Sequence, residues 1–279
     1  MREQDVCTLE ARYVYAVIPG TSRDEFGPIG LGGARVYVLW QGEIGALVHD
    51  CPPEPYQGDT ETMMGCVNTH NGVIDRAWAE AGSILPMRFD VIVRPDEGHT
   101  ADENVRRWLE EEHSNFKIKL DEFRDKVELG VQILWDPAVI ASKLAEGSEE
   151  LRALKAAMAD MSKGTAYLQR HKIAEIVKQE MERKAIRDYT ACYAALSKHA
   201  ESIHVNKLQK HDTKTMIANL ALLVQREKVE AVGAALGSFS EEEGVEVRFT
   251  GPWPPYTFAA KIPVAGERSL VGQGLGNAG

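Results

Sequence analysis

A proline-rich segment near the end of the 279-residue chain limits most strongly how it can fold. Residues 251–256 read Gly-Pro-Trp-Pro-Pro-Tyr, between a charged, strand-like run at 245–250 and Thr-Phe-Ala-Ala at 257–260. Each proline fixes its own φ, lacks an N–H donor and pushes the preceding residue to extended geometry. The segment is therefore predicted to be neither helix nor central strand, but a rigid corner that holds Trp253 and Tyr256 at a defined angle.

Trp253 and Tyr256 allow two interpretations. Aromatic rings mostly serve burial, which favours a structural corner that packs both rings onto its own domain. The alternative is an aromatic ledge that faces a protein partner. Both interpretations stay open from the sequence, and the two residues are candidate partner-binding residues.

Four segments, in the same order along the chain, resemble the gas vesicle protein F/L family, accessory proteins of gas vesicle assembly. They are the proline-rich corner, Leu-Pro-Met-Arg-Phe at 85–89, Gly-Thr-Ala-Tyr-Leu at 164–168 and Asn-Leu-Ala-Leu-Leu-Val at 219–224. The resemblance covers most of the chain. It departs from the family at Met87 for the usual leucine, at Thr165 for lysine, and at Asp90 where the family generally has glycine. The last departure leaves open how the turn after the Arg-Phe pair is made.

Composition indicates a soluble globular protein. The chain is 44% hydrophobic and 27% charged, which is ordinary for that class, and its length favours two domains. It has no run of eighteen or more apolar residues and no signal-peptide core at its acidic start, so we expect a cytoplasmic protein. The net charge of −10 argues against nucleic acids and anionic membranes as partners. The four scattered cysteines are expected to be free thiols.

The first part of the chain, residues 1–126, predicts an α+β domain. A strand at 13–18 and a hairpin at 34–40 and 43–48 precede a helix that Asp59 caps and that ends before Gly82. Residues 84–93 are expected to be extended. Thr100 and Glu103 match a capping box, and the helix they begin is expected to continue to about residue 126.

The second part, residues 127–264, predicts a modified ferredoxin-like βαββαβ domain with an enlarged helical crossover. Its strands are expected at 127–135, 203–208, 215–224 and 245–250. Asp136 and Pro137 begin a helix that Gly147 closes, and helix formers dominate from 148 to 202 with a break near Gly164. A further helix is expected at 226–239. Residues 265–279 are glycine-rich and are expected to form a flexible tail.

The sequence offers no strong catalytic constellation, so we predict no catalytic residue, cofactor or metal site. Cys66 and His70 share a helix face, but a zinc site needs three or four ligands, and a buried thiol beside a surface histidine is the better interpretation. His49 and Cys51 are close in sequence only, which does not define a nucleophilic site. The protein is therefore expected not to be an enzyme.

Three further residues are candidates for partner binding. Arg88 lies in an apolar extended segment, where its guanidinium must reach solvent or find acceptors. A clamp between domains and a contact with a substrate or partner both remain open for it. Tyr189 and Tyr193 lie on the helical crossover, which could bind a partner by helix packing; a sheet edge could bind one by strand addition.

The resemblance implies an assembly factor that binds the hydrophobic shell protein of gas vesicles, associates with the vesicle and contacts other accessory proteins. A binding partner could keep the apolar face of the shell subunit from aggregating. The alternative is a small-molecule-binding regulator or enzyme on a ferredoxin-like scaffold, a fold that hosts many functions. This alternative predicts converging polar groups near Arg88 or the loop of His49.

Overall fold

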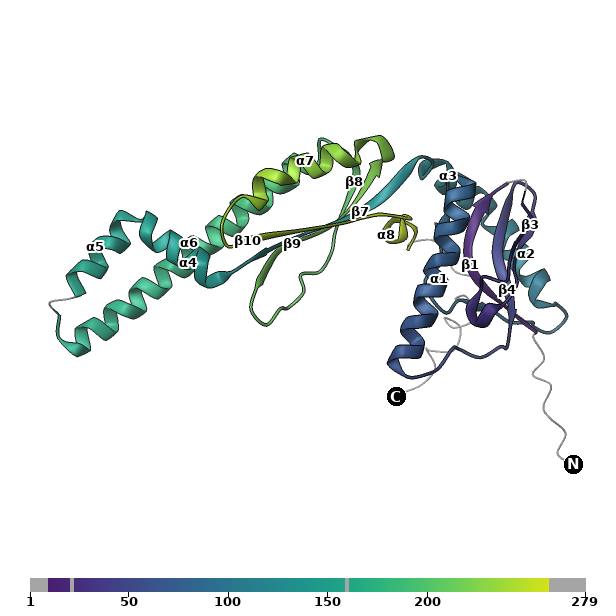
Figure 1. Ribbon diagram of the computed structural model, residues 1–279, viewed down its shortest axis with the longest axis horizontal. Coiled ribbons are helices and arrows are strands. Elements are labelled where there is room, and N and C mark those ends of the chain that lie inside the picture. The colour runs from purple at the N-terminus through teal and green to yellow at the C-terminus, as the bar shows by residue number, and fades with distance from the viewer. Residues whose placement is uncertain (1–9, 21–22, 159–160, 261–279) are drawn as a thin grey trace, which may run out of the picture. The chain divides into compact units, whose positions relative to one another are not determined.

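The computed structural model describes residues 10–20, 23–158 and 161–260. Helices and strands are mixed, as the expected α+β class requires (Figure 1). The described residues form two compact units, one comprising 10–128 and 253–260, the other Leu129–Pro252. The second unit thus ends before the corner is complete, whereas the sequence suggested an end at 264. The expected tail at 265–279 lies outside the described residues.

The first unit is built on a six-stranded sheet with the order β2-β3-β4-β1-β5, in which β6 also pairs with β1. The strand β1 is antiparallel to β4, β5 and β6. Gly42, at φ 61°, makes the turn of the predicted hairpin between β3 and β4. The elements are β1 (Ala11–Pro19), β2 (Glu25–Gly27), β3 (Val36–Gln41), β4 (Ile44–Cys51), α1 (Thr60–Ala81), β5 (Leu85–Pro86), β6 (Ile92–Val93), α2 (Ala101–Glu111), α3 (His113–Glu122) and α8 (Tyr256–Ala259).

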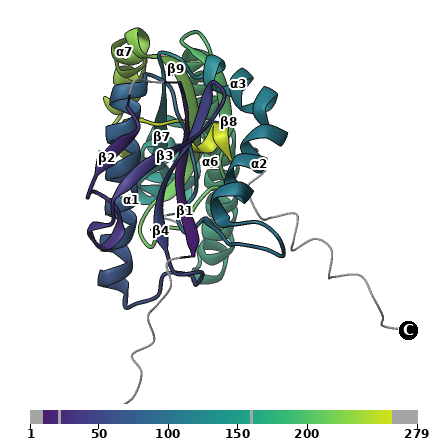
Figure 2. The same cartoon turned by 90° about the vertical axis from the view of Figure 1, so that its right-hand side faces the viewer.

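Helices cover both faces of this sheet, which explains why β1 is buried along almost its whole length. Side chains alternate between the two faces of a strand. On one face Tyr13 reaches His70 of α1, and on the other Arg12 pairs with Asp102 of α2. Figure 2 shows the strands of this sheet side by side. The first unit is therefore a three-layer arrangement with β1 at its centre.

Local capping sets the helix boundaries of this unit as the sequence predicts. Asp59 accepts a hydrogen bond from the backbone N–H of Thr62, and Gly82 ends α1 in the left-handed conformation at φ 70°. Thr100 and Glu103 form the reciprocal capping box. The expected single helix to residue 126 is instead two helices, α2 and α3, which are separated at the buried Glu112.

The segment expected to be extended from 84 to 93 contains a turn between β5 and β6. Asp90 has φ 71°, a region that glycine adopts easily and that aspartate tolerates better than most residues. Its backbone N–H donates to the Tyr13 hydroxyl, and its carboxylate accepts from the Tyr56 N–H. These bonds explain how an aspartate holds a turn where the family generally has glycine.

The second unit has a four-stranded sheet with the order β10-β7-β9-β8. The strand β9 lies between β7 and β8, so the helices after β7 form the expected enlarged crossover of a split β-α-β arrangement. Helices α6 and α7 pack together over this sheet (Figure 1). The elements are β7 (Lys126–Trp135), α4 (Pro137–Gly147), α5 (Glu149–Ala157), α6 (Lys163–Leu196), β8 (Ala200–Val205), β9 (Thr215–Gln225), α7 (Val229–Ser240) and β10 (Val245–Trp253).

The central strand β9 forms the core of the second unit, and its residues from Met216 to Val224 are buried. One of them is polar: the side-chain amide of Asn219 donates to the carbonyl oxygen of Lys207, in the connection between β8 and β9. A buried amide needs such a partner. The asparagine at the start of the Asn-Leu-Ala-Leu-Leu-Val segment therefore anchors that connection to the sheet.

Three boundaries differ from the sequence predictions. Helix α6 ends at Leu196 and β8 begins at Ala200, although helix was expected to 202. The strand β10 extends to Trp253, because it is an outer strand of the sheet, where a proline without an N–H is tolerated. The residues Tyr256–Ala259 form a helical turn, so helix begins at the last residue of a segment that was predicted to be neither helix nor central strand.

Candidate partner-binding surfaces

The five predicted partner-binding residues fall in different parts of the structure. Trp253 is 49% exposed at the end of β10, and Arg88 is exposed between β5 and β6. Tyr256 is half-buried on α8. Tyr189 and Tyr193 both lie on α6, where their ring centroids are 6.1 Å apart. The structure therefore brings these two tyrosines together.

Ile186 completes an apolar surface with these tyrosines, and we call the three residues the α6 patch. Ile186 is 68% exposed and Tyr193 is 37% exposed, while Tyr189 is half-buried between them. Residues three and four positions apart are neighbours on a helix surface, so the three side chains form one continuous strip. The sequence reasoning missed Ile186, although its spacing from Tyr189 and Tyr193 was a usable signal.

The α6 patch lies beside the side of the helix that packs into the second unit. Cys192 and Leu196 are fully buried, and α6 contacts both α4 and α7. Lys184 adds polar contacts, since its ammonium hydrogen bonds to Asp188 and to Glu242, each at 2.9 Å. Burial, the largest influence, lowers the pKa of Lys184, but these bonds outweigh it and raise the pKa overall. The patch is therefore presented on an anchored helix.

Apolar side chains also lie on the outer strands of the second sheet. Val205 at the end of β8 is 52% exposed, Leu208 just after it is 51% exposed, and Phe249 of β10 is 40% exposed. Both strands are at the ends of the sheet order. An outer strand offers backbone groups to which an extended partner segment can pair. These edges are a second possible surface.

The corner residue Tyr256 is an internal anchor. Its hydroxyl donates to Asn71 Oδ1 of α1 at 3.1 Å. Next to it, the N–H and hydroxyl of Thr257 donate to the Glu128 carboxylate at 2.7 and 2.6 Å. These bonds hold residues 256–260 in the first unit. Trp253 is more exposed than the half-buried Tyr256.

The two histidines considered for chemistry are buried. His70 Nδ1 lies 2.9 Å from the Tyr13 hydroxyl and its Nε2 lies 3.1 Å from the Met87 carbonyl oxygen. Cys66 is half-buried, which reverses the expected pair of buried thiol and surface histidine. His49 bonds to the Tyr56 hydroxyl through Nε2 at 2.9 Å. Both ring nitrogens of His70 thus bond within the fold, and His49 lies beneath aromatic rings.

Aromatic rings surround His49 as well. His49 stacks on Tyr13 and contacts Tyr15, with ring centroids 5.0 and 5.3 Å away. Within the described ranges, no group of three or more His, Cys, Asp and Glu side chains is placed to hold a metal ion. In the same ranges, none of the helices has the length and apolar character to span a membrane.

Comparisons with known proteins agree with the sequence resemblance. The family model described as gas vesicle synthesis protein GvpL/GvpF matches residues 11–260. Gas vesicle protein L1 of Halobacterium salinarum is 33% identical over 265 residues, covering 90% of this chain and 91% of that protein. Gas vesicle protein F of a Streptomyces species is 27% identical, covering 88% of this chain and 98% of its own length.

Solved structures resemble the fold. The crystal structure of gas vesicle protein GvpF from an Anabaena species has a TM-score of 0.71 at 18% identity and covers 90% of this chain and 98% of that one. GvpF from Microcystis aeruginosa has a TM-score of 0.64 at 16% identity and covers 90% and 99%. At such identities the likeness concerns the fold alone, whereas the match of the family model concerns the sequence. From that match and the 33% identical relative, we conclude that this chain belongs to the gas vesicle synthesis protein GvpL/GvpF family.

Proposed function

We propose that this protein is a non-catalytic assembly factor that binds the hydrophobic shell subunit of gas vesicles through the α6 patch. Membership of the GvpL/GvpF family implies a role in gas vesicle formation, and the relatives named above are gas vesicle proteins. Association with gas vesicles and contact with other accessory proteins are part of the same proposal. The single observation that carries the choice of surface is the exposure of Ile186 beside two tyrosines on α6.

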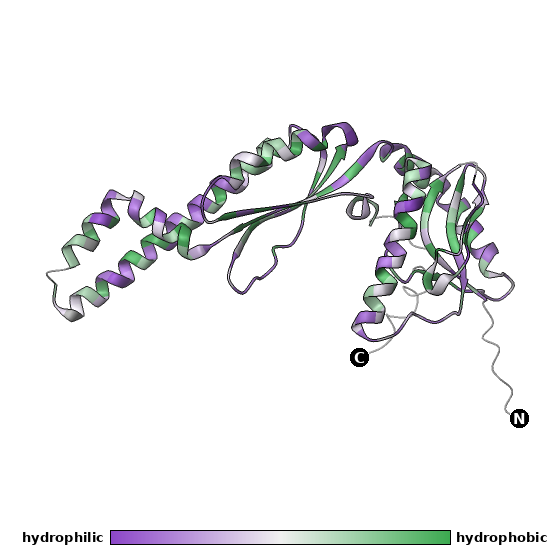
Figure 3. Ribbon diagram, in the orientation of Figure 1, coloured by the Kyte–Doolittle hydropathy of each residue, from purple (hydrophilic) through white to green (hydrophobic). Residues whose placement is uncertain are grey.

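The physical reason is the apolar character of such a shell subunit. An apolar face in water gains about 25 cal/mol for each Å² that a partner buries, so a free subunit aggregates unless another surface covers it. Tyrosine and isoleucine supply apolar area on a helix whose other exposed residues are mostly charged or polar (Figure 3). A helix face of this kind fits a second apolar helix or a hydrophobic sheet surface.

The test is co-purification of the tagged protein with coexpressed shell subunit, scored as soluble shell protein in the eluate. The variant Ile186→Asp with Tyr193→Ser should reduce recovery several-fold, because a buried carboxylate without a partner is costly. Leu168→Asp is the matched control: Leu168 is 69% exposed on the same helix but lies outside the patch. Its recovery should equal that of the unchanged protein.

Two results would contradict the proposal. Normal recovery with the Ile186→Asp, Tyr193→Ser variant would exclude the α6 patch as the binding surface. No recovery with the unchanged, folded protein would exclude direct binding to the shell subunit and favour action through another accessory protein. Trp253→Ala should be tested by itself, because Tyr256→Ala would also remove the bond to Asn71 and disturb the first unit.

A further inference from the structure

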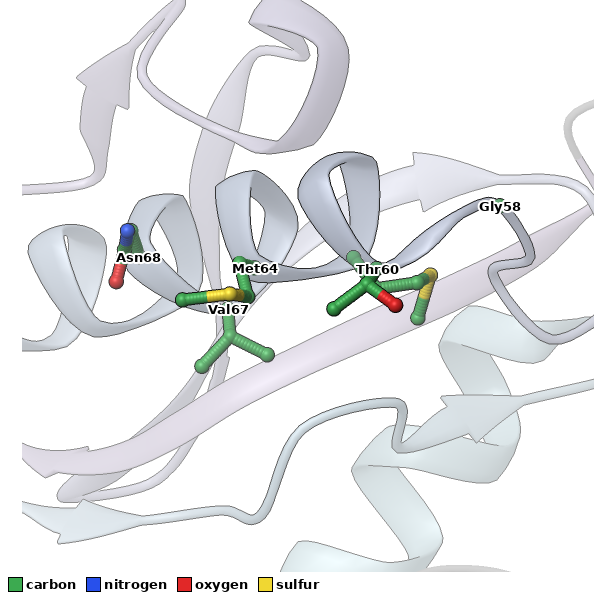
Figure 4. A pocket seen from close by; sticks show the side chains of 6 residues that line it. Gly58, Thr60, Met64, Val67 and Asn68 are labelled. Atoms are coloured by element: carbon green, nitrogen blue, oxygen red, sulfur yellow. The ribbon is translucent and has the colours of Figure 1, made fainter.

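A groove along α1 and the open edge of β8 also carry accessible apolar side chains. The groove has a volume of about 440 Å³ and is lined by Gly58, Thr60, Met63, Met64, Val67 and Asn68. Figure 4 shows Thr60, Met64, Val67 and Asn68 in a row along the helix. A helix satisfies its backbone hydrogen bonds internally, so the groove offers a partner side chains alone. The edge of β8 offers backbone groups as well.

The backbone of β8 has a free side, because β8 is the last strand in the order β10-β7-β9-β8. The N–H of Asn206, just after β8, donates to the carbonyl oxygen of Asn219 in β9 at 2.8 Å. Along an antiparallel pair, only every second residue bonds to the partner strand. His204 therefore falls on the bonded side with Asn206, whereas the N–H and C=O groups of Ile203 and Val205 point to the open side.

The side chains along this edge are apolar and accessible. Ile203 and Val205 stand opposite Leu222 and Leu220 of β9, so the four side chains share one face of the sheet. Leu222 and Leu220 are buried, whereas Ile203 is half-buried and Val205 is 52% exposed. A strand added at this edge, with apolar residues at alternate positions, extends that face and covers Val205.

Lysines continue the surface beyond Val205. Residues 198–214 contain four lysines but only one glutamate and one aspartate, although the whole chain has 32 basic and 42 acidic residues. Lys214 forms an ion pair with Glu246. Lys207 and Lys210 are exposed, and neither forms an ion pair within the part of the chain that the structure describes. Carboxylates of a partner are therefore favoured at this end of the edge.

We propose that the β8 edge binds an extended, acidic segment of a partner protein by strand addition. The segment pairs with the backbone of Ile203 and Val205, places alternate apolar side chains beside theirs, and brings carboxylates to Lys207 and Lys210. An acidic segment fits this edge better than a second copy of β8, which would bring further lysines to it. The site does not include the α6 patch, so it stands independently of the function proposed above.

Fluorescence anisotropy of a labelled peptide tests this site in the full-length protein. The probe is acetyl-Glu-Asp-Glu-Thr-Val-Thr-Val-Thr-Glu-Asp-Glu-amide, whose acids at both ends reach the lysines in either strand direction. Val205→Pro should weaken binding at least about ten-fold, because proline removes the outward N–H and leaves the bonds to β9 in place. Val205→Thr is the matched control. It keeps the N–H and the branched shape, so affinity should change less than about two-fold.

A second pair of variants tests the charge. Lys207→Glu with Lys210→Glu should weaken binding at least about ten-fold and remove most of its dependence on salt. Lys172→Glu with Lys178→Glu makes the same change in net charge at exposed positions of α6. This control should bind almost as the unchanged protein does. Thermal melting followed by circular dichroism verifies that each variant is folded.

Four results would overturn the proposal. One is that the unchanged protein does not bind the peptide. Another is that Val205→Pro and Val205→Thr bind it equally, because the peptide would then be held without strand addition. A third is that both lysine pairs lose binding alike, which would show attraction to net charge alone. The last is that oligouridine RNA binds more tightly than the peptide and equally well to Val205→Pro, which would assign the lysines to a nucleic acid.

Discussion

Lowering the pH from about 7.5 to about 5 should destabilise the first unit, because His49 and His70 are buried in this unit in their neutral form. The bonds of His70 require the neutral ring. The Met87 carbonyl can only accept, so Nε2 carries the proton and Nδ1 accepts from the Tyr13 hydroxyl. That hydroxyl in turn accepts from the N–H of Asp90. Protonating Nδ1 would turn it into a donor and break this chain of bonds.

The magnitude follows from the pKa values. Burial lowers the pKa of His49 and of His70 from 6.5 to about 4, although the bond to Met87 opposes the change at His70. A group with a lowered pKa in the fold stabilises it fully above the unfolded value, and this stability is lost as the pH falls below 6.5. At pH 5 the loss is about 2 kcal/mol for each histidine, or about 4 kcal/mol for both.

The assay is urea unfolding read by pulsed hydrogen exchange and mass spectrometry, in which peptides of β1 and α1 report the first unit separately from the second. His70→Gln and His49→Gln should each remove about half of the pH dependence. His99→Gln is the control, because His99 is exposed in the same unit. A change of less than about 1 kcal/mol between the two pH values would refute the reasoning, as would variants that keep the full dependence.

Three further predictions concern the packing of the same unit. Gly45→Ala should cost about 1–3 kcal/mol and lower the Tm in calorimetry, because its Cβ would clash with Val38 Cγ1 and the Trp40 ring; an unchanged Tm would show that these β3 side chains can move aside at no cost. Thr100→Ala should cost about 1 kcal/mol in urea unfolding by removing the capping box, and no loss would contradict the role of the cap. Tyr256→Phe removes the hydrogen bond to Asn71, so it should cost about 1 kcal/mol and speed hydrogen exchange at residues 257–260. Unchanged exchange would show that this hydrogen bond does not hold the segment.

Local signals were sufficient for many element boundaries. Asp59, Thr100 and Asp136 cap the helices that the sequence assigned to them, and each bonds to a backbone N–H two or three residues away. The order of strands and helices in the second unit could likewise be predicted from its apolar periodicity. These features depend on interactions between residues close in sequence, so they can be predicted without knowledge of the tertiary structure.

The candidate surfaces were less predictable, because exposure depends on distant parts of the chain. The sequence proposed Tyr189 and Tyr193 but could not show which neighbouring side chains of α6 are buried: Cys192 and Leu196 are fully buried, whereas Tyr193 is 37% exposed. It placed His70 at the surface, whereas β1 and the turn at Asp90 enclose it. The pairing of Tyr256 with Asn71 joins residues far apart in the chain, and no local pattern indicates it.

The α+β class, the helix caps and the family could all be predicted from the sequence, because each depends on residue types at fixed local spacing. Which apolar side chains remain exposed depends on the three-dimensional packing, since burial is set by the elements that pack around each side chain. At the corner, where the sequence left a structural role and a partner-facing ledge open, Tyr256 is an internal anchor and Trp253 is exposed. The tertiary structure also placed Ile186 beside the α6 tyrosines and opened the groove along α1.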